Sequence, residues 1–375
     1  MTREPTANPQ QLAWLSSLRT PTATLSWSLY EWDRVIRLAR RLRLLARLAE
    51  SITGAGLIEC VPPQPRRHLL AELRLSRWRS ASLTWTLRQV GAALQPGAYP
   101  CVLLKGGAYM AQGLPIASGR LPSDLDILVP KSAVPAAQES LAAAGWHAVG
   151  MDEHDRRYYE DWSHEVPPMR HPRLSVELDL HHNILPPVGR NPVDAKALLS
   201  RLRPSKWPPW QVLAPEDQVL HCAANLFLDS ELRDRTRDLV DLDGLFRHFG
   251  AEMQFWPSLL ARASELGLVE PLALACHFCA RWLRTPIPQA TQSQVNTLGL
   301  GWSRRAWLLP LLSHVMSPTD PDEMPRWTSN AAAAVLLGRY HRRRLPLRIL
   351  VPHLWHKIRI GARFDRARDR PGKGT

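Results

Sequence analysis

Two aspartates directly before an apolar run are the residues of this chain best suited to do chemistry. Asp124 and Asp126 are separated by one residue and lead into Ile127–Val129, a pattern typical of a β-strand. Alternate residues of a strand point to the same face, so the two carboxylates are expected to lie close together and to repel each other. A divalent cation between them removes that repulsion, and hard oxygen ligands suit Mg²⁺ or Mn²⁺. The alternative is a solvated strand end, because Asp-x-Asp often occurs by chance.

A second segment has the composition of a phosphate-binding turn. The apolar run 101–104 predicts a strand, and it leads through Lys105, Gly106 and Gly107 into a segment that is expected to be helical. A strand, two glycines and a helix start let backbone N–H groups approach a phosphate, and the lysine adds a positive charge. A purely steric need for glycine at a strand-to-helix turn would explain the same pattern.

A third segment supplies further polar side chains. Alternation over 174–182 places Glu177, Asp179 and His181 on one face of a predicted strand. A third carboxylate on a neighbouring strand would complete a two-metal site for phosphoryl transfer and could help deprotonate the nucleophile. The pair His181–His182 also suggests zinc, but no third nitrogen or sulfur ligand stands at a recognisable spacing. We therefore expect Glu177 and His181 to support the metal ligands indirectly.

These segments, in this order, resemble the nucleotidyltransferase superfamily of DNA polymerase β type, and within it the bacterial group of largely uncharacterised nucleotidyltransferases. The resemblance rests on Leu-Leu-Lys-Gly-Gly, Gly-Arg-Leu-Pro-Ser-Asp-Leu-Asp-Ile-Leu-Val and Glu-Leu-Asp-Leu-His-His, and it covers roughly residues 95–250. It implies an α+β fold in which a small mixed β-sheet is flanked by helical regions. It also implies Mg²⁺-dependent transfer of a nucleoside monophosphate from an NTP, with ATP the expected donor, to an acceptor.

The resemblance also implies roles for particular residues. The three expected metal ligands and catalytic residues are Asp124, Asp126 and Asp179. The residues expected to contact the nucleotide are Lys105, Gly106, Gly107, Arg120 and Ser123. One departure is Gly107, which stands where many superfamily members have a serine whose hydroxyl touches a phosphate. This departure keeps open a non-catalytic nucleotide-binding or scaffold protein as the alternative.

The acceptor is not identified by the sequence. By analogy alone, a small molecule, a peptide or a protein is the preferred acceptor, and an RNA end is the alternative.

Two predicted helices follow the core. Pro215 and the acids after it predict a helix start, and that helix carries His221. The next helix carries Arg237 and Asp241, which are four residues apart and are expected to pair on one helical face. In the alternative, Arg237 or His221 faces the cleft and contacts the nucleotide or the acceptor.

Composition limits the class of protein. The chain has 375 residues, 45% of them hydrophobic, which is enough for a packed core. No apolar run reaches the roughly 20 residues that cross a bilayer, and the first residues lack the order of a signal peptide. Five cysteines are few for this length, which favours a reducing, cytoplasmic location. Cys276 and Cys279 have Cys-x-x-Cys spacing but are expected to be buried packing residues.

The chain is strongly basic, with a formal net charge of +14 and a pI near 10.2. Arginines alternate with apolar residues over 34–47, which predicts a basic amphipathic helix, and a second basic segment covers 342–370. Such segments attract nucleic acids or anionic membrane surfaces. Solvated helix faces are the preferred interpretation, so nucleic-acid binding and peripheral membrane contact remain alternatives.

Four regions are therefore expected. They are an N-terminal helical region (1–95), a nucleotidyltransferase core (96–190), a C-terminal helical region (191–360) and a disordered basic tail (361–375). In the first region the pattern predicts helices over roughly 26–51 and 65–94, the second with a possible break. Trp207–Trp210, with two central prolines, predicts a rigid surface loop.

Overall fold

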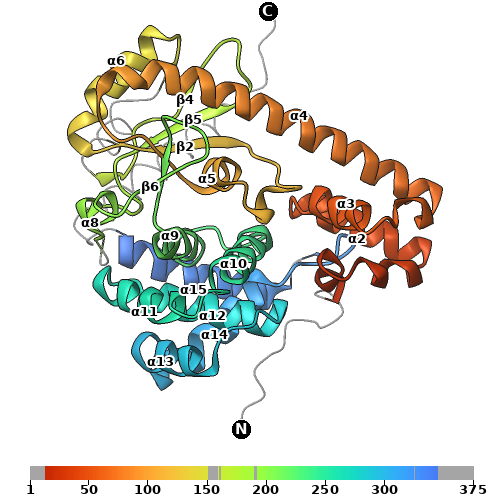
Figure 1. Ribbon diagram of the computed structural model, residues 1–375. Helices are drawn as coiled ribbons and strands as arrows, with labels where there is room; N and C mark the ends of the chain where they lie inside the picture. The colour runs from red at the N-terminus through yellow and green to blue at the C-terminus, as the bar shows by residue number, and fades with distance from the viewer. Residues whose placement is uncertain (1–12, 151–158, 160–161, 190–191, 325, 345–375) are drawn as a thin grey trace, which may run out of the picture.

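The computed structural model describes residues 13–150, 159, 162–189, 192–324 and 326–344. These residues form a mixed β-sheet with helices before, beside and after it (Figure 1). The fold is therefore α+β with helical flanks, as the sequence predicted. The basic tail and the arginines beyond residue 344 lie outside the described residues.

The central strands of the sheet are the ones that carry the predicted chemistry. β2 (Asp124–Leu128) runs parallel to β5 (Glu177–His181) and antiparallel to β1 (Val102–Leu103). The other strands in the described residues are β3 (His147–Ala148), β4 (Met169–Arg170), β6 (Arg203–Pro204) and β7 (Gln211–Val212), in the order β3-β4-β5-β2-β1-β7-β6. Because β6 and β7 join the sheet, it extends past the predicted end of the core at 190.

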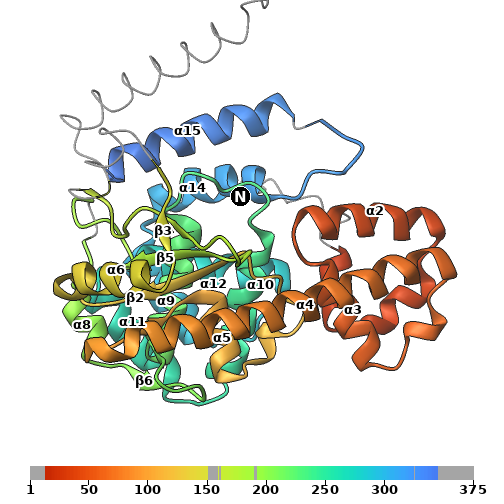
Figure 2. The same ribbon diagram turned by 90° about the horizontal axis from the view of Figure 1, so that it is seen from above.

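The N-terminal helices differ from the prediction of one long basic helix. α2 (Leu29–Arg41) begins at a capping box and ends before Arg43, whose φ of 57° turns the chain. α3 (Leu45–Gly54) then runs on in a new direction. Leu42 and Leu44, at this turn, are buried. The change of direction lets both α2 and α3 pack against α4. Figure 2 shows α2 and α3 grouped around the N-terminal part of α4, beside the rest of the molecule.

One long helix links this group to the sheet. α4 (Pro63–Leu94) is 32 residues long and has no break. It packs against α6 (Val134–Ala143), and Figure 1 shows both on one side of the sheet. α5 (Lys105–Gln112) follows β1 directly and contacts β2. Trp210 is 3% exposed and donates a hydrogen bond to the carbonyl of Leu87 in α4, so the predicted surface loop has a buried anchor.

The C-terminal region is a helical bundle. Its described helices are α8 (Ala195–Leu199), α9 (Pro215–Phe227), α10 (Thr236–Phe249), α11 (Phe255–Glu265), α12 (Val269–Leu283), α13 (Gln289–Gly299), α14 (Trp302–Met316) and α15 (Trp327–Arg344). α9 lies at its centre and packs against α10, α11 and α12. Cys276 and Cys279 are free, buried residues of α12, as predicted.

The arginines of α2 have partners within the protein. Arg34 pairs with Asp320, and Arg37 pairs with Asp322 at 2.6 Å. Arg41 lies 3.4 Å from Asp234. These contacts tie α2 to segments of the C-terminal region, so the solvated face expected here is partly an internal interface.

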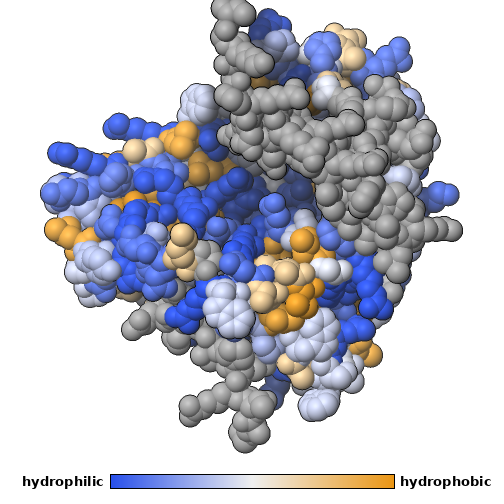
Figure 3. Space-filling view, turned by 180° about the vertical axis from the view of Figure 1, so that it is seen from behind, coloured by the Kyte–Doolittle hydropathy of each residue, from blue (hydrophilic) through white to orange (hydrophobic). Residues whose placement is uncertain are grey.

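The outer surface is mixed in character. Seen from behind, it is mainly hydrophilic, with apolar side chains gathered in separate patches (Figure 3). Within the described residues, no helix combines the length and the apolar character needed to span a bilayer.

Candidate active site

The two aspartates of β2 occupy different environments on one face of the sheet. Leu125 and Ile127, on the other face, are fully buried in the core, which fixes the direction of their neighbours. Asp124 is half-buried at the start of the strand, and the Ser123 hydroxyl donates a hydrogen bond to its Oδ1 at 3.1 Å. Asp126 is only 3% exposed. The predicted common orientation therefore arises because the apolar residues between and after the aspartates are buried.

Asp126 is the most strongly paired group of the site. Its Oδ1 lies 2.7 Å from Lys105 Nζ and 3.0 Å from His181 Nε2. Burial alone would raise the pKa of Asp126, but the charge of Lys105 and the contact with His181 outweigh it and hold the pKa well below its usual range. Asp126 is therefore ionised. Both contacts fall on the same oxygen, and no side chain among the described residues hydrogen-bonds to Oδ2.

Asp179 lies beside Asp126, but its surroundings raise the pKa of its carboxyl group, whereas those of Asp126 lower it. The parallel register of β2 and β5 pairs Asp126 with Asp179 and Asp124 with Glu177. Burial, followed by repulsion from Asp126, raises the pKa of Asp179 to about 7. Within the described part of the chain, no hydrogen bond or ion pair compensates this carboxyl group. A bound cation would relieve that cost, so the oxygen donors of the three aspartates suit Mg²⁺ or Mn²⁺.

A second group of candidate ligands includes two residues that the sequence analysis missed. His164, Glu165 and His181 each offer a ligand atom within 4.8 Å of the others, whereas the three aspartates do not meet that distance among the described residues. His164 and Glu165 lie well before His181 in the chain, and no spacing signals the contact. The sequence shows no third nitrogen or sulfur ligand at a recognisable spacing, whereas the structure brings one nitrogen ligand, His164, and one carboxylate, Glu165, to His181.

The glycine pair has a packing role that is visible in the structure. A Cβ atom at Gly106 would overlap the Arg120 guanidinium, so any other residue there would force Arg120 to move out of its ion pair. A Cβ atom at Gly107 would lie 3.4 Å from Leu125 Cδ1 and 3.6 Å from Leu103 Cδ2. A serine at 107 would therefore point into the apolar contact between α5 and the sheet. Both residues lie in the first turn of α5, where backbone N–H groups lack intrahelical partners.

Arg120 is held away from the aspartates by a buried ion pair. Its Nε lies 2.9 Å from Asp241 Oδ2, and its guanidinium stacks over the Tyr109 ring at 5.6 Å. The predicted pair between Arg237 and Asp241 was wrong, because Asp241 is taken by Arg120 and Arg237 instead lies 3.4 Å from Asp238. The stronger, buried partner reaches Asp241 from a distant loop, which helical spacing could not indicate.

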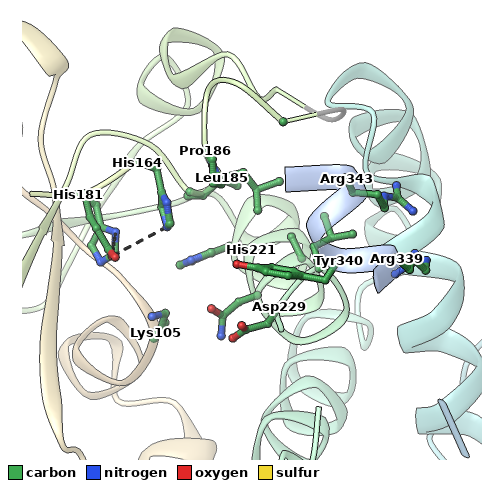
Figure 4. A pocket seen from close by; sticks show the side chains of 16 residues that line it. Lys105, His164, His181, Leu185, Pro186, His221, Asp229, Arg339, Tyr340 and Arg343 are labelled. Carbon is green, nitrogen blue, oxygen red and sulfur yellow. Dashed lines mark ion pairs between the residues drawn. The ribbon is translucent and has the colours of Figure 1, made fainter. Parts of the chain in front are cut away.

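A cavity of about 270 Å³ opens beside Lys105 and His181. Figure 4 shows these two residues at one end, His221 of α9 between, and side chains of α15 at the far end. The lining residues from α15 are Arg339, Tyr340 and Arg343. Burial, with a smaller effect of Lys105, lowers the pKa of His221 to about 3, so this imidazole is neutral. The cavity joins the predicted core to the C-terminal bundle.

Comparison with known proteins gives one family. The model of a family described as "Uncharacterised nucleotidyltransferase" matches residues 28–284. No curated protein and no solved structure shows significant similarity to the chain. The matched stretch includes every residue predicted for the site and ends just after α12, before the helix that closes the cavity.

Proposed function

The chain belongs to the family of uncharacterised nucleotidyltransferases, and from this premise we propose that it transfers a nucleoside monophosphate from an NTP, preferably ATP, to an acceptor. The observation that carries the proposal is the register of β2 and β5, which sets Asp126 against Asp179, with Asp124 on the same strand as Asp126. In the proposal these three carboxylates hold Mg²⁺ or Mn²⁺. When bound, the ions would stabilise the charge that develops on the phosphates.

The reaction is a substitution at phosphorus. An acceptor oxygen forms a bond to the α-phosphorus, and the bond from that phosphorus to the oxygen bridging to the β-phosphate breaks. The electron pair leaves with pyrophosphate, and the acceptor's proton passes to a base. Asp179 is the proposed base, because the register of β2 and β5 places its carboxylate beside Asp126, in the set of carboxylates that would surround the reacting phosphate.

Other residues would hold the substrate or the carboxylates. Lys105 neutralises Asp126 and lines the cavity, so its ammonium can also contact a phosphate oxygen that enters there. The N–H groups of Gly106 and Gly107 are the proposed phosphate donors. Ser123 orients Asp124 through its hydroxyl. Arg120 is assigned to positioning, because its charge is compensated by Asp241 and its guanidinium packs directly against Gly106.

The far end of the cavity is the proposed acceptor site. Three arginines surround one buried glutamate there: Arg339 and Arg343 both pair with Glu270, and Arg304 lies 2.7 Å from it. Because Arg339 and Arg343 line the cavity, an acceptor with an anionic group would meet cationic side chains there. α15, which lines this end of the cavity and lies outside the matched residues, would then select the acceptor.

The described contacts bear on two alternatives. The non-catalytic alternative rested on Gly107, but a side chain at that position would face Leu103 and Leu125 and not the cavity. The RNA alternative rested on two basic segments: Arg34 and Arg37 of the first are held in ion pairs within the protein, and most of the second, beyond residue 344, lies outside the described residues. A small-molecule, peptide or protein acceptor remains the preferred proposal.

The test is incubation of the purified protein with each α-labelled NTP, Mg²⁺ and a cell extract. Label should pass to an acceptor with the wild type and not with Asp126→Asn. Glu139→Gln removes an exposed carboxylate of α6 and should behave as the wild type. Labelling by Asp126→Asn at the wild-type rate would reject the proposed site.

A further inference from the structure

We propose that His164, Glu165 and His181 form a second cation site, selective for a transition metal such as Zn²⁺ and separate from the three aspartates. Their ligand atoms lie within 4.8 Å of one another. The proposal stands on the geometry of these side chains and does not depend on the proposed transfer reaction. No spacing in the sequence indicates it.

The backbone brings the three residues together. Glu165, which comes before the start of β4, forms an isolated antiparallel bridge with His181. The amide of Val166 donates to the carbonyl of Leu180 at 2.9 Å, and the amide of His182 donates to the carbonyl of His164 at 2.8 Å. The segment before β4 is thus hydrogen-bonded to the edge of β5. Two regular backbone contacts, and not a mobile side chain, hold the ligands side by side.

His181 has the orientation of a metal-binding histidine. Its side chain is 4% exposed, and its Nε2 lies 3.0 Å from Asp126 Oδ1. The buried Nδ1 makes no hydrogen bond, although Glu165 Oε2 is 3.3 Å away. Histidines that bind metals usually donate the other ring N–H to a carboxylate, which fixes the ring and leaves the second nitrogen for the ion. Asp126 supplies that carboxylate.

The distances suit a small tetrahedral ion. Two ligands that are each about 2.0 Å from such an ion lie roughly 3.3 Å apart. His181 Nδ1 and Glu165 Oε2 already have that separation, and His164 Nε2 is 4.0 Å from the same oxygen. A small movement of His164, which is partly exposed, would close the site.

The chemistry of the ligands separates this site from the aspartates. Two imidazoles and one carboxylate favour Zn²⁺ or Co²⁺, whereas Mg²⁺ prefers the all-oxygen set. All three residues line the cavity, so a fourth coordination position would face it. A water molecule or an oxygen of the acceptor would fit that position.

The test uses Co²⁺ as a visible probe of the full-length protein. The wild type should bind one equivalent of Co²⁺ with the absorption of a four-coordinate ion. Zn²⁺ should displace it, and millimolar Mg²⁺ should not. Glu165→Gln and His164→Asn should each weaken Co²⁺ binding at least tenfold, while His147→Asn, which changes an exposed histidine of β3, should leave it unchanged.

Two further variants separate this site from the proposed Mg²⁺ site. Asp179→Asn should keep the Co²⁺ spectrum, because Asp179 belongs only to the Mg²⁺ set. Asp126→Asn removes the carboxylate behind His181 and should weaken Co²⁺ binding about 10- to 100-fold. Three results would each overturn the proposal: no Co²⁺ or Zn²⁺ binding by the wild type, unchanged binding in Glu165→Gln and His164→Asn, or displacement of Co²⁺ by Mg²⁺.

Discussion

Asp179→Asn should stabilise the protein in the absence of divalent cations. The pKa of Asp179 is raised from 3.8 to about 7 in the folded chain, so its ionised form is disfavoured by folding. The cost is absent below about pH 4, grows as pH rises, and is complete once pH passes the folded pKa. At about 1.4 kcal/mol per pH unit, the full cost at pH 8 is about 4 kcal/mol. Asparagine removes the charge without a change in volume, so the variant escapes this cost.

The assay is urea unfolding followed by tryptophan fluorescence, in EDTA, from pH 5 to pH 8. The free energy of unfolding of Asp179→Asn should exceed that of the wild type by an amount that grows by about 2–3 kcal/mol between pH 5 and pH 8. Any fixed effect of the amide cancels, because only the change with pH is compared. Glu177→Gln, on the same strand but paired with Arg170, should show no such trend. A difference that stays constant with pH would refute the assigned environment of Asp179.

Three other changes test particular contacts. Asp126→Asn leaves Lys105 and His181 beside a neutral amide, so it should lower the free energy of unfolding by about 3 kcal/mol in urea titrations, in addition to abolishing transfer. If Asp126 only repelled the neighbouring carboxylates, its replacement would instead raise the free energy of unfolding slightly. An unchanged stability would therefore contradict the pairing of Asp126 with Lys105 and His181. Gly106→Ala should displace Arg120 and cost about 1–3 kcal/mol by the same measurement, whereas Gly107→Ala meets Leu125 at an ordinary contact distance and should cost less. Equal effects of the two alanines would argue against this account of the pair. Changing Arg34, Arg37 and Arg41 to glutamine should lower the melting temperature slightly and leave transfer unaltered, because their partners are within the protein. A steep salt dependence of RNA binding that is lost in this triple variant would make RNA the preferred acceptor.

The strands and the order of the motifs could be predicted from the sequence because local patterns determine them. The aspartates precede a buried apolar run, and the alternation over 177–181 is regular, so β2 and β5 followed from side-chain period alone. The helix start at Pro215 was likewise a local signal. The long helix α4 was predicted with a possible break that the structure does not contain.

Long-range pairings could not be predicted in this way. Arg120 reaches Asp241 across 121 residues, and Arg34 reaches Asp320 across 286. From the sequence, each arginine is therefore expected to face solvent or a ligand. In the structure, each instead pairs with a carboxylate from a remote part of the chain. The His164–Glu165–His181 group depends on an isolated backbone bridge, which leaves no periodic signal. The turn at Arg43 depends on packing against α4, which periodicity over 34–47 does not report.

The central claim is that Asp124, Asp126 and Asp179 bind a divalent cation together with an NTP. It is tested most directly by calorimetric titration of a non-hydrolysable ATP analogue, with and without Mg²⁺. For the wild type, Mg²⁺ should raise the affinity at least tenfold, which is about 1.4 kcal/mol. In Asp126→Asn and Asp179→Asn the effect of Mg²⁺ should disappear, while Glu139→Gln should retain it. A wild-type affinity that is the same with and without Mg²⁺ would contradict the claim.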